Sequence, residues 1–106
     1  MNEVKLTGRV VNQLQSNVGD TSKCMFNVEV KRSKLLPTDK HQCDYPRVTA
    51  FDEVAENFIR TVKRGDVVKI TGWIHVAVIG TDGFNRYVTE IIAENIEKEE
   101  AINESI

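Results

Sequence analysis

The feature that most constrains this chain is an alternation of apolar and polar residues that is interrupted once. The alternation runs through residues 2–11, 24–33 and 66–79, and again through the last apolar stretch, NRYVTEIIAENI. Successive side chains point to opposite faces of a strand, so this pattern is typical of β-strands with one buried face. A further strand is expected in CDYPRVTAF, residues 43–51. The pattern predicts a mainly β protein.

The interruption predicts one helix after residue 51. Its apolar stripe has the helical spacing and comprises Val54, Ala55, Phe58, Ile59 and Val62. Asp52 is a candidate N-cap, and Gly65 is expected to close the helix after two basic residues. Five strands with one helix between the third and the fourth are the order of an OB-fold, an all-β, five-stranded Greek-key barrel.

Length and composition fit a single soluble domain. The chain has 106 residues, and no apolar run approaches the length that spans a membrane. The N-terminal segment alternates instead of forming an apolar block, so we expect no signal peptide. Cys24 and Cys43 are far apart and predict reduced thiols in a cytoplasmic protein. Neither a metal site nor a cofactor is expected, because His41 with Cys43 would need two further ligands.

The charge is distributed unevenly. The whole chain carries a net charge of −2, but residues 97–106 hold four glutamates against one lysine, so residues 1–96 carry about +1. We expect an OB-fold domain over 1–96 and an acidic, disordered tail over 97–106. A nearly neutral body cannot bind a polyanion by charge alone, so such a partner would have to be held by a second kind of contact.

The strand before the helix offers that second contact. Its face opposite the core carries Tyr45, Arg47, Thr49 and Phe51. Bases of single-stranded nucleic acid stack on aromatic rings whatever their sequence, and an arginine can bind phosphate through paired hydrogen bonds. The alternative is that the barrel twists enough to pack either ring beneath a loop.

Trp73 is a second outward aromatic residue. It shares a strand face with Lys69, Thr71 and His75, and we expect the opposite, core-facing side to carry Val68, Ile70, Ile74 and Val76. A tryptophan facing away from a core is typical of an interface, with either a nucleic acid or another subunit. Burial beneath the acidic tail is a further alternative. His75 by itself is interpreted as a surface residue.

Three stretches resemble the single-stranded DNA-binding proteins of bacteria and bacteriophages. They are NEVKLTGRV at the start, VTAFDEVAENF followed by KRGDVVKITG, and RYVTEIIAENI at the end. The resemblance extends from Asn2 to about Ile96. It implies a non-catalytic OB-fold that coats single-stranded DNA in replication, recombination or repair, with aromatic residues at Tyr45 and Phe51 stacking on bases.

The resemblance also implies a homo-oligomer, either a tetramer or a dimer. The expected DNA-binding set combines rings, cations and hydroxyl or imidazole groups: Lys5, Lys31, Lys34, Tyr45, Arg47, Thr49, Phe51, Trp73, His75, Phe84 and Arg86. This chain departs from the family in having few rings outside the central strand, where only Phe84 could replace a missing one. It ends in NESI instead of acidic residues followed by Pro-Phe, so the resemblance does not extend to recruitment of replication or recombination proteins by that route.

Two other classes of function are alternatives to DNA binding. An enzyme would need a nucleophile with a base, paired carboxylates or a metal cluster, and the sequence shows no such motif. An OB-fold adaptor of a replication or primosome complex would bind only protein, through Trp73 and the barrel face. Titration with oligo(dT) separates this adaptor from a DNA-binding protein.

Overall fold

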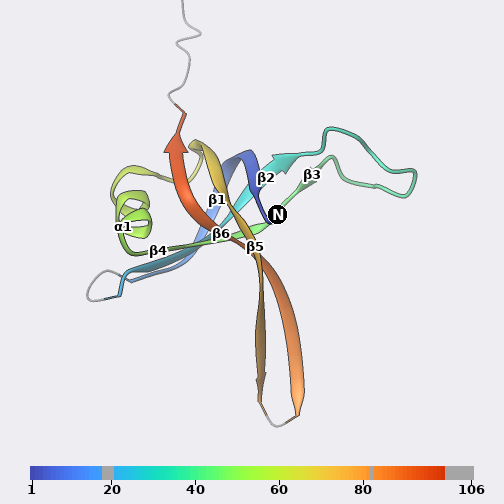
Figure 1. Cartoon of the computed structure of the whole chain (residues 1–106). Coiled ribbons are helices and arrows are strands. Elements are labelled where there is room, and N and C mark those ends of the chain that lie inside the picture. The colour runs from blue at the N-terminus through green and yellow to red at the C-terminus, as the bar shows by residue number, and fades with distance from the viewer. Residues whose placement is uncertain (18–20, 82, 100–106) are drawn as a thin grey trace, which may run out of the picture.

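A ring of five strands with one helix forms the body of the molecule, seen in the computed structural model, which describes residues 1–17, 21–81 and 83–99 (Figure 1). The elements follow in the order β1 (Val4–Asn17), β2 (Lys23–Lys31), β3 (Cys43–Asp44), β4 (Arg47–Phe51), α1 (Asp52–Thr61), β5 (Val67–Thr81) and β6 (Phe84–Lys98). Within the described ranges, no helix is long and apolar enough to cross a membrane.

The strand pairing closes the ring. The sheet order is β1-β5-β6-β4-β2-β3, and β1 also pairs with β2. All of these pairs are antiparallel except β4 with β6, which is parallel. The two-residue β3 pairs only with the end of β2, so the closed barrel has five strands and the helix follows the third of them. The predicted OB-fold is confirmed.

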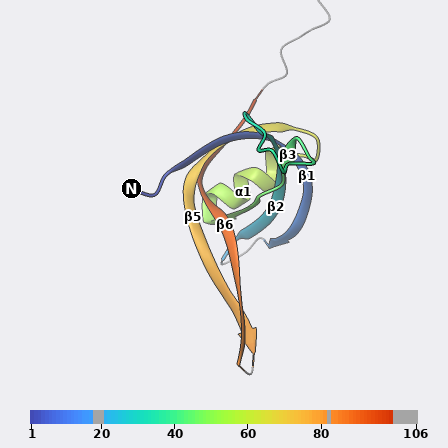
Figure 2. The same ribbon diagram turned by 90° about the vertical axis from the view of Figure 1, so that its right-hand side faces the viewer.

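The helix packs against the core of the barrel. Figure 2 shows α1 within the outline of the strand ring. Phe58 and Ala55 are buried, and the Phe58 ring stacks on Phe26 of β2 with centroids 4.0 Å apart and planes at 15°. Aromatic rings bury more apolar area than other side chains, so this pair is the centre of the core.

The ends of the helix differ from the sequence prediction. Asp52 is the first helical residue and not its cap; the N-cap is Phe51, with no side-chain cap hydrogen bond. The Asp52 backbone N–H instead donates to the carbonyl of Ser22 at 2.9 Å. The helix ends at Thr61, four residues before Gly65, which lies in the following turn with a φ of +97°. Glycine adopts this left-handed conformation without steric cost.

Two predicted boundaries also moved. Residues 12–17 lie outside the alternating segments 2–11 and 24–33, yet they continue β1 along β2. Their polar side chains give no strand pattern, and the strand is defined by backbone pairing with β2. The predicted strand over residues 43–51 is divided into β3 and β4 at Tyr45 and Pro46. Proline lacks an N–H for the ladder, which explains the division.

The end of β6 runs further than expected. The strand continues to Lys98, and the Glu99 backbone N–H donates to the carbonyl of Val67 at 2.8 Å. Residues 97–99, the start of the predicted tail, therefore lie along the barrel. Residues 100–106 lie outside the described residues, so the disorder expected for them stays a prediction.

The hairpin of β5 and β6 extends beyond the barrel as a two-stranded arm, seen below the body in Figure 1. We call residues 74–89 the arm. Strand β5 ends at Thr81 and β6 begins at Phe84. At the base of the arm, the pairing shifts register between Thr71 and Gly72. A side chain at Gly72 would collide with the backbone of Ile92, so the two strands can cross closely only at glycine.

Candidate nucleic-acid interface

The outer face of β4 lies in the middle of the candidate surface. Strand β4 pairs with β2 on one side and β6 on the other, and β6 pairs in turn with β5. Side chains that are far apart in sequence therefore line one continuous face. Lys23 of β2 lies opposite Phe51 of β4, and His75 of β5 lies opposite Glu90 of β6.

Two aromatic side chains of the predicted set are exposed at this face. Tyr45 is 54% exposed and Phe51 is 39% exposed. The Tyr45 hydroxyl donates to Glu29 Oε2 at 3.1 Å, which fixes one end of its ring and, with the nearby negative charge, raises the pKa of Tyr45. The Nζ atom of Lys23 lies 5.7 Å from the centroid of the Phe51 ring. Neither ring is packed beneath a loop, so both can take a stacking partner.

Thr49 lies on the predicted face but is only 1% exposed. Its hydroxyl donates to Glu90 Oε1, and Arg47 Nη2 donates to the same oxygen at 3.1 Å. His75 Nδ1 lies 2.9 Å from the other carboxylate oxygen of Glu90. The expectation that Thr49 is accessible to DNA on this face is wrong, because the side chains of Arg47, His75 and Glu90 cover its hydroxyl.

Glu90 holds the group together and was missed as a functional candidate, although it belongs to the RYVTE stretch. The carboxylate is 6% exposed. Burial pushes its pKa upward, but hydrogen bonds from Thr49, His75 and Arg47 outweigh burial and lower the pKa below the ordinary value of glutamate. Glu90 is therefore ionised at neutral pH. The signal in the sequence that could have identified Glu90 was a glutamate among otherwise apolar positions of a strand.

Trp73 lies beside this group. It is half-buried and paired opposite Ile92 of β6, and its ring meets the His75 ring edge-on with centroids 5.8 Å apart. Lys5 of β1 is exposed and lies opposite Thr71, two residues before Trp73 on β5. Trp73 thus faces away from the core, as predicted.

The remaining predicted cations and the last ring occupy two projections. Phe84 is 84% exposed and, with the exposed Arg86, lies at the tip of the arm. Lys31 is exposed at the end of β2, and Lys34 is exposed in the loop between β2 and β3, which extends to the right of the barrel in Figure 1. The predicted set is therefore distributed over the barrel face, the arm, this loop and β1.

Arg32 organises the loop between β2 and β3. Its guanidinium donates to Asp44 at 2.6 Å and to the carbonyl of His41 at 2.8 Å, and lies 3.1 Å from Asp39. The hydrogen bond from Arg32 lowers the pKa of Asp44. The charge of Arg32 is thus compensated within the loop, whereas Lys31 and Lys34 form no ion pair with any residue that the structure describes.

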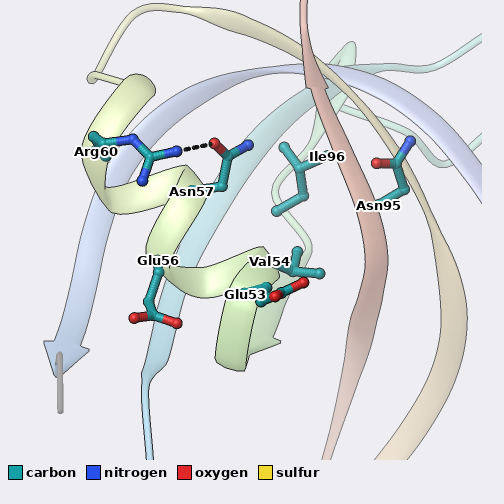
Figure 3. Close-up of a pocket in the computed structure, with 7 residues that line it drawn as sticks. All are labelled: Glu53, Val54, Glu56, Asn57, Arg60, Asn95 and Ile96. Atoms are coloured by element: carbon teal, nitrogen blue, oxygen red, sulfur yellow. Dashed lines mark hydrogen bonds between the residues drawn. The ribbon is translucent and has the colours of Figure 1, made fainter.

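A separate groove lies between α1 and β6 (Figure 3). Its volume is about 480 Å³, and it is lined by Glu53, Val54, Glu56, Asn57, Arg60, Asn95 and Ile96. Arg60 donates to Asn57 at 2.8 Å, so its cation is directed along the helix. The lining carries no aromatic ring and both signs of charge, and is not part of the candidate surface. Among the residues that the structure describes, no cluster could hold a metal ion.

A barrel of this topology, with exposed rings on one face and exposed cations on that face and on the neighbouring elements, defines an OB-fold of the kind that binds single-stranded nucleic acid. The chain belongs to the Single-strand binding protein family, whose sequence profile matches residues 1–98. The predicted resemblance is confirmed.

Curated relatives share about a quarter of their residues with this chain. Single-stranded DNA-binding protein 1 of Clostridium acetobutylicum is 27% identical over 110 residues, covering 100% of both chains. Single-stranded DNA-binding protein 3 of Streptococcus agalactiae is 27% identical, covering 97% of this chain and 77% of its own. The Single-stranded DNA-binding protein of Streptococcus pneumoniae is 27% identical, and the match covers 92% of this chain and 64% of that relative.

Proposed function

We propose that this protein binds single-stranded DNA without catalysis and with little sequence preference, coating it during replication, recombination or repair. The observation that carries the proposal is the pair of exposed rings, Tyr45 and Phe51, on the barrel face. Stacking of a base on an aromatic side chain contributes about 1–3 kcal/mol and needs no particular base. The family and the names of the relatives support the same activity.

The cations supply the second part of the proposed affinity. Lys5, Lys31, Lys34 and Arg86 are exposed and can contact phosphates along a strand that crosses the barrel face. Lys23 joins them, because its ammonium lies beside the Phe51 ring, where a stacked base would bring its own phosphate close. Lys23 was not among the residues predicted from the sequence, since its position opposite Phe51 depends on the pairing of β2 with β4.

The test is a fluorescence polarisation titration of labelled oligo(dT) and of duplex DNA of the same length at one salt concentration. Duplex DNA hides its base faces, so we expect much weaker binding to the duplex. Equal affinity for both would contradict stacking and leave only a basic surface. Binding to neither would favour the adaptor, the second candidate function.

We further propose a homo-oligomer in the bacterial cytoplasm, or in that of the host if the chain is phage-encoded. Its support is the arm, where Ile74, Val76 and Val78 are exposed on one face of β5. Contiguous exposed aliphatic side chains on a soluble protein are typical of an interaction surface. Sedimentation velocity tests whether the arm is that surface. It compares wild type with Val78→Thr and with Thr89→Val, which is the opposite exchange on the facing strand. A wild-type monomer would contradict the proposal.

A further inference from the structure

The buried carboxylate of Glu90 lies on the binding face and not in the core. It connects three strands, because it accepts hydrogen bonds from Thr49 and Arg47 of β4 and contacts His75 of β5. The Arg47 side chain is itself largely covered, with 24% of its surface exposed. The cation at the centre of the proposed site is therefore held in an ion pair before any ligand arrives.

The ion pair changes what Arg47 can contribute to binding. A free lysine or arginine that contacts a phosphate releases counter-ions, which makes binding weaken as salt rises. Arg47 and an ionised Glu90 together have no net charge, so a phosphate beside them releases few counter-ions. If a phosphate displaced Glu90 from Arg47, the buried carboxylate would keep its contacts with Thr49 and His75 but lose the arginine charge that compensates it. Removing the partner charge of a buried ion is strongly unfavourable.

We propose that Glu90 is a specificity-determining residue that acts as an intramolecular counter-ion to Arg47. By cancelling the central positive charge, Glu90 makes this part of the face recognise stacked bases instead of phosphates. It thereby favours single strands over duplex DNA, which offers the same phosphates but no open base faces. This role rests on the proposed function. In it, Arg47 acts as a hydrogen-bond donor whose charge is already compensated by Glu90.

The decisive variant is Glu90→Gln, which keeps the shape and one acceptor oxygen but removes the negative charge. Arg47 then becomes an uncompensated cation. We expect the slope of log K against log salt for oligo(dT) to become steeper by about 0.7, the contribution of one added phosphate contact on a single strand. Affinity for duplex DNA should rise as well, so the ratio of single-strand to duplex affinity should fall.

A double variant keeps the test valid if Glu90→Gln does not fold. Arg47→Gln combined with Glu90→Gln removes both charges, so the slope should equal that of wild type. If Arg47 were instead a phosphate contact in wild type, the double variant would lose about 0.7 of slope, and that result would overturn the proposal. The matched control is Glu56→Gln, the same change of charge at an exposed position on α1, for which we expect the wild-type slope.

The wild-type titration separates the two proposals. No binding of wild type to oligo(dT) would overturn the proposed function and, with it, the role of Glu90. Wild-type binding with an unchanged slope in Glu90→Gln would overturn only the role of Glu90. A steeper slope in Glu90→Gln, with the wild-type slope in the double variant, is the expected result.

Discussion

Replacing Phe51 with alanine should weaken binding to oligo(dT) about 10- to 70-fold. An aromatic side chain can bury about 150–250 Å², and 39% of Phe51 is still exposed in the free protein. A stacked base could therefore cover about 60–100 Å² of it, and at about 25 cal/mol per Å² this is about 1.5–2.5 kcal/mol. The value falls within the range of about 1–3 kcal/mol that is typical of base stacking.

The assay is a polarisation titration of labelled oligo(dT) at several salt concentrations. Stacking releases no counter-ions, so Phe51→Ala should reduce affinity at every salt concentration and leave the salt slope unchanged. Phe51→Trp keeps a ring at the position and should bind nearly as tightly as wild type. A folded Phe51→Ala protein, checked by circular dichroism, that binds as tightly as wild type would refute the reasoning and remove Phe51 from the site.

Three further results are expected. Phe58→Ala removes the ring stacked on Phe26 and should lower the free energy of unfolding by about 3–5 kcal/mol in urea; a loss below about 1 kcal/mol would mean that this pair is not central to the core. Burial raises the pKa of Cys24 to about 11, so in the native protein a thiol reagent should modify the half-buried Cys43 first and Cys24 only on unfolding; equal rates would contradict the buried position. The pKa of Glu90 is lower folded than unfolded, so its stabilisation is present above the ordinary glutamate pKa of about 4.3 and is lost as pH falls below it; in urea melts at several pH values, Glu90→Gln should lose less stability on acidification than wild type.

The sequence by itself determined the order of the barrel elements and the inward and outward positions on the strand before the helix. Alternation places Val48 and Ala50 in the core and Tyr45 and Phe51 outside, because the two faces of a strand are fixed by the backbone alone. The change to helical spacing located α1 correctly, and Phe58 lies in the core as its stripe predicts. Local periodicity suffices for such features, since each depends only on neighbours along the chain.

Only the tertiary structure decided which side chains meet across the barrel. Arg47 and Glu90 are 43 residues apart in sequence, and their ion pair exists because β4 and β6 are parallel neighbours in the ring. The pairing of β2 with β4 likewise brings Lys23 to Phe51. In the sequence Arg47 is interpreted as a free cation, because charge compensation depends on the distance between groups in space. Strand register sets that distance, and no local pattern specifies strand register.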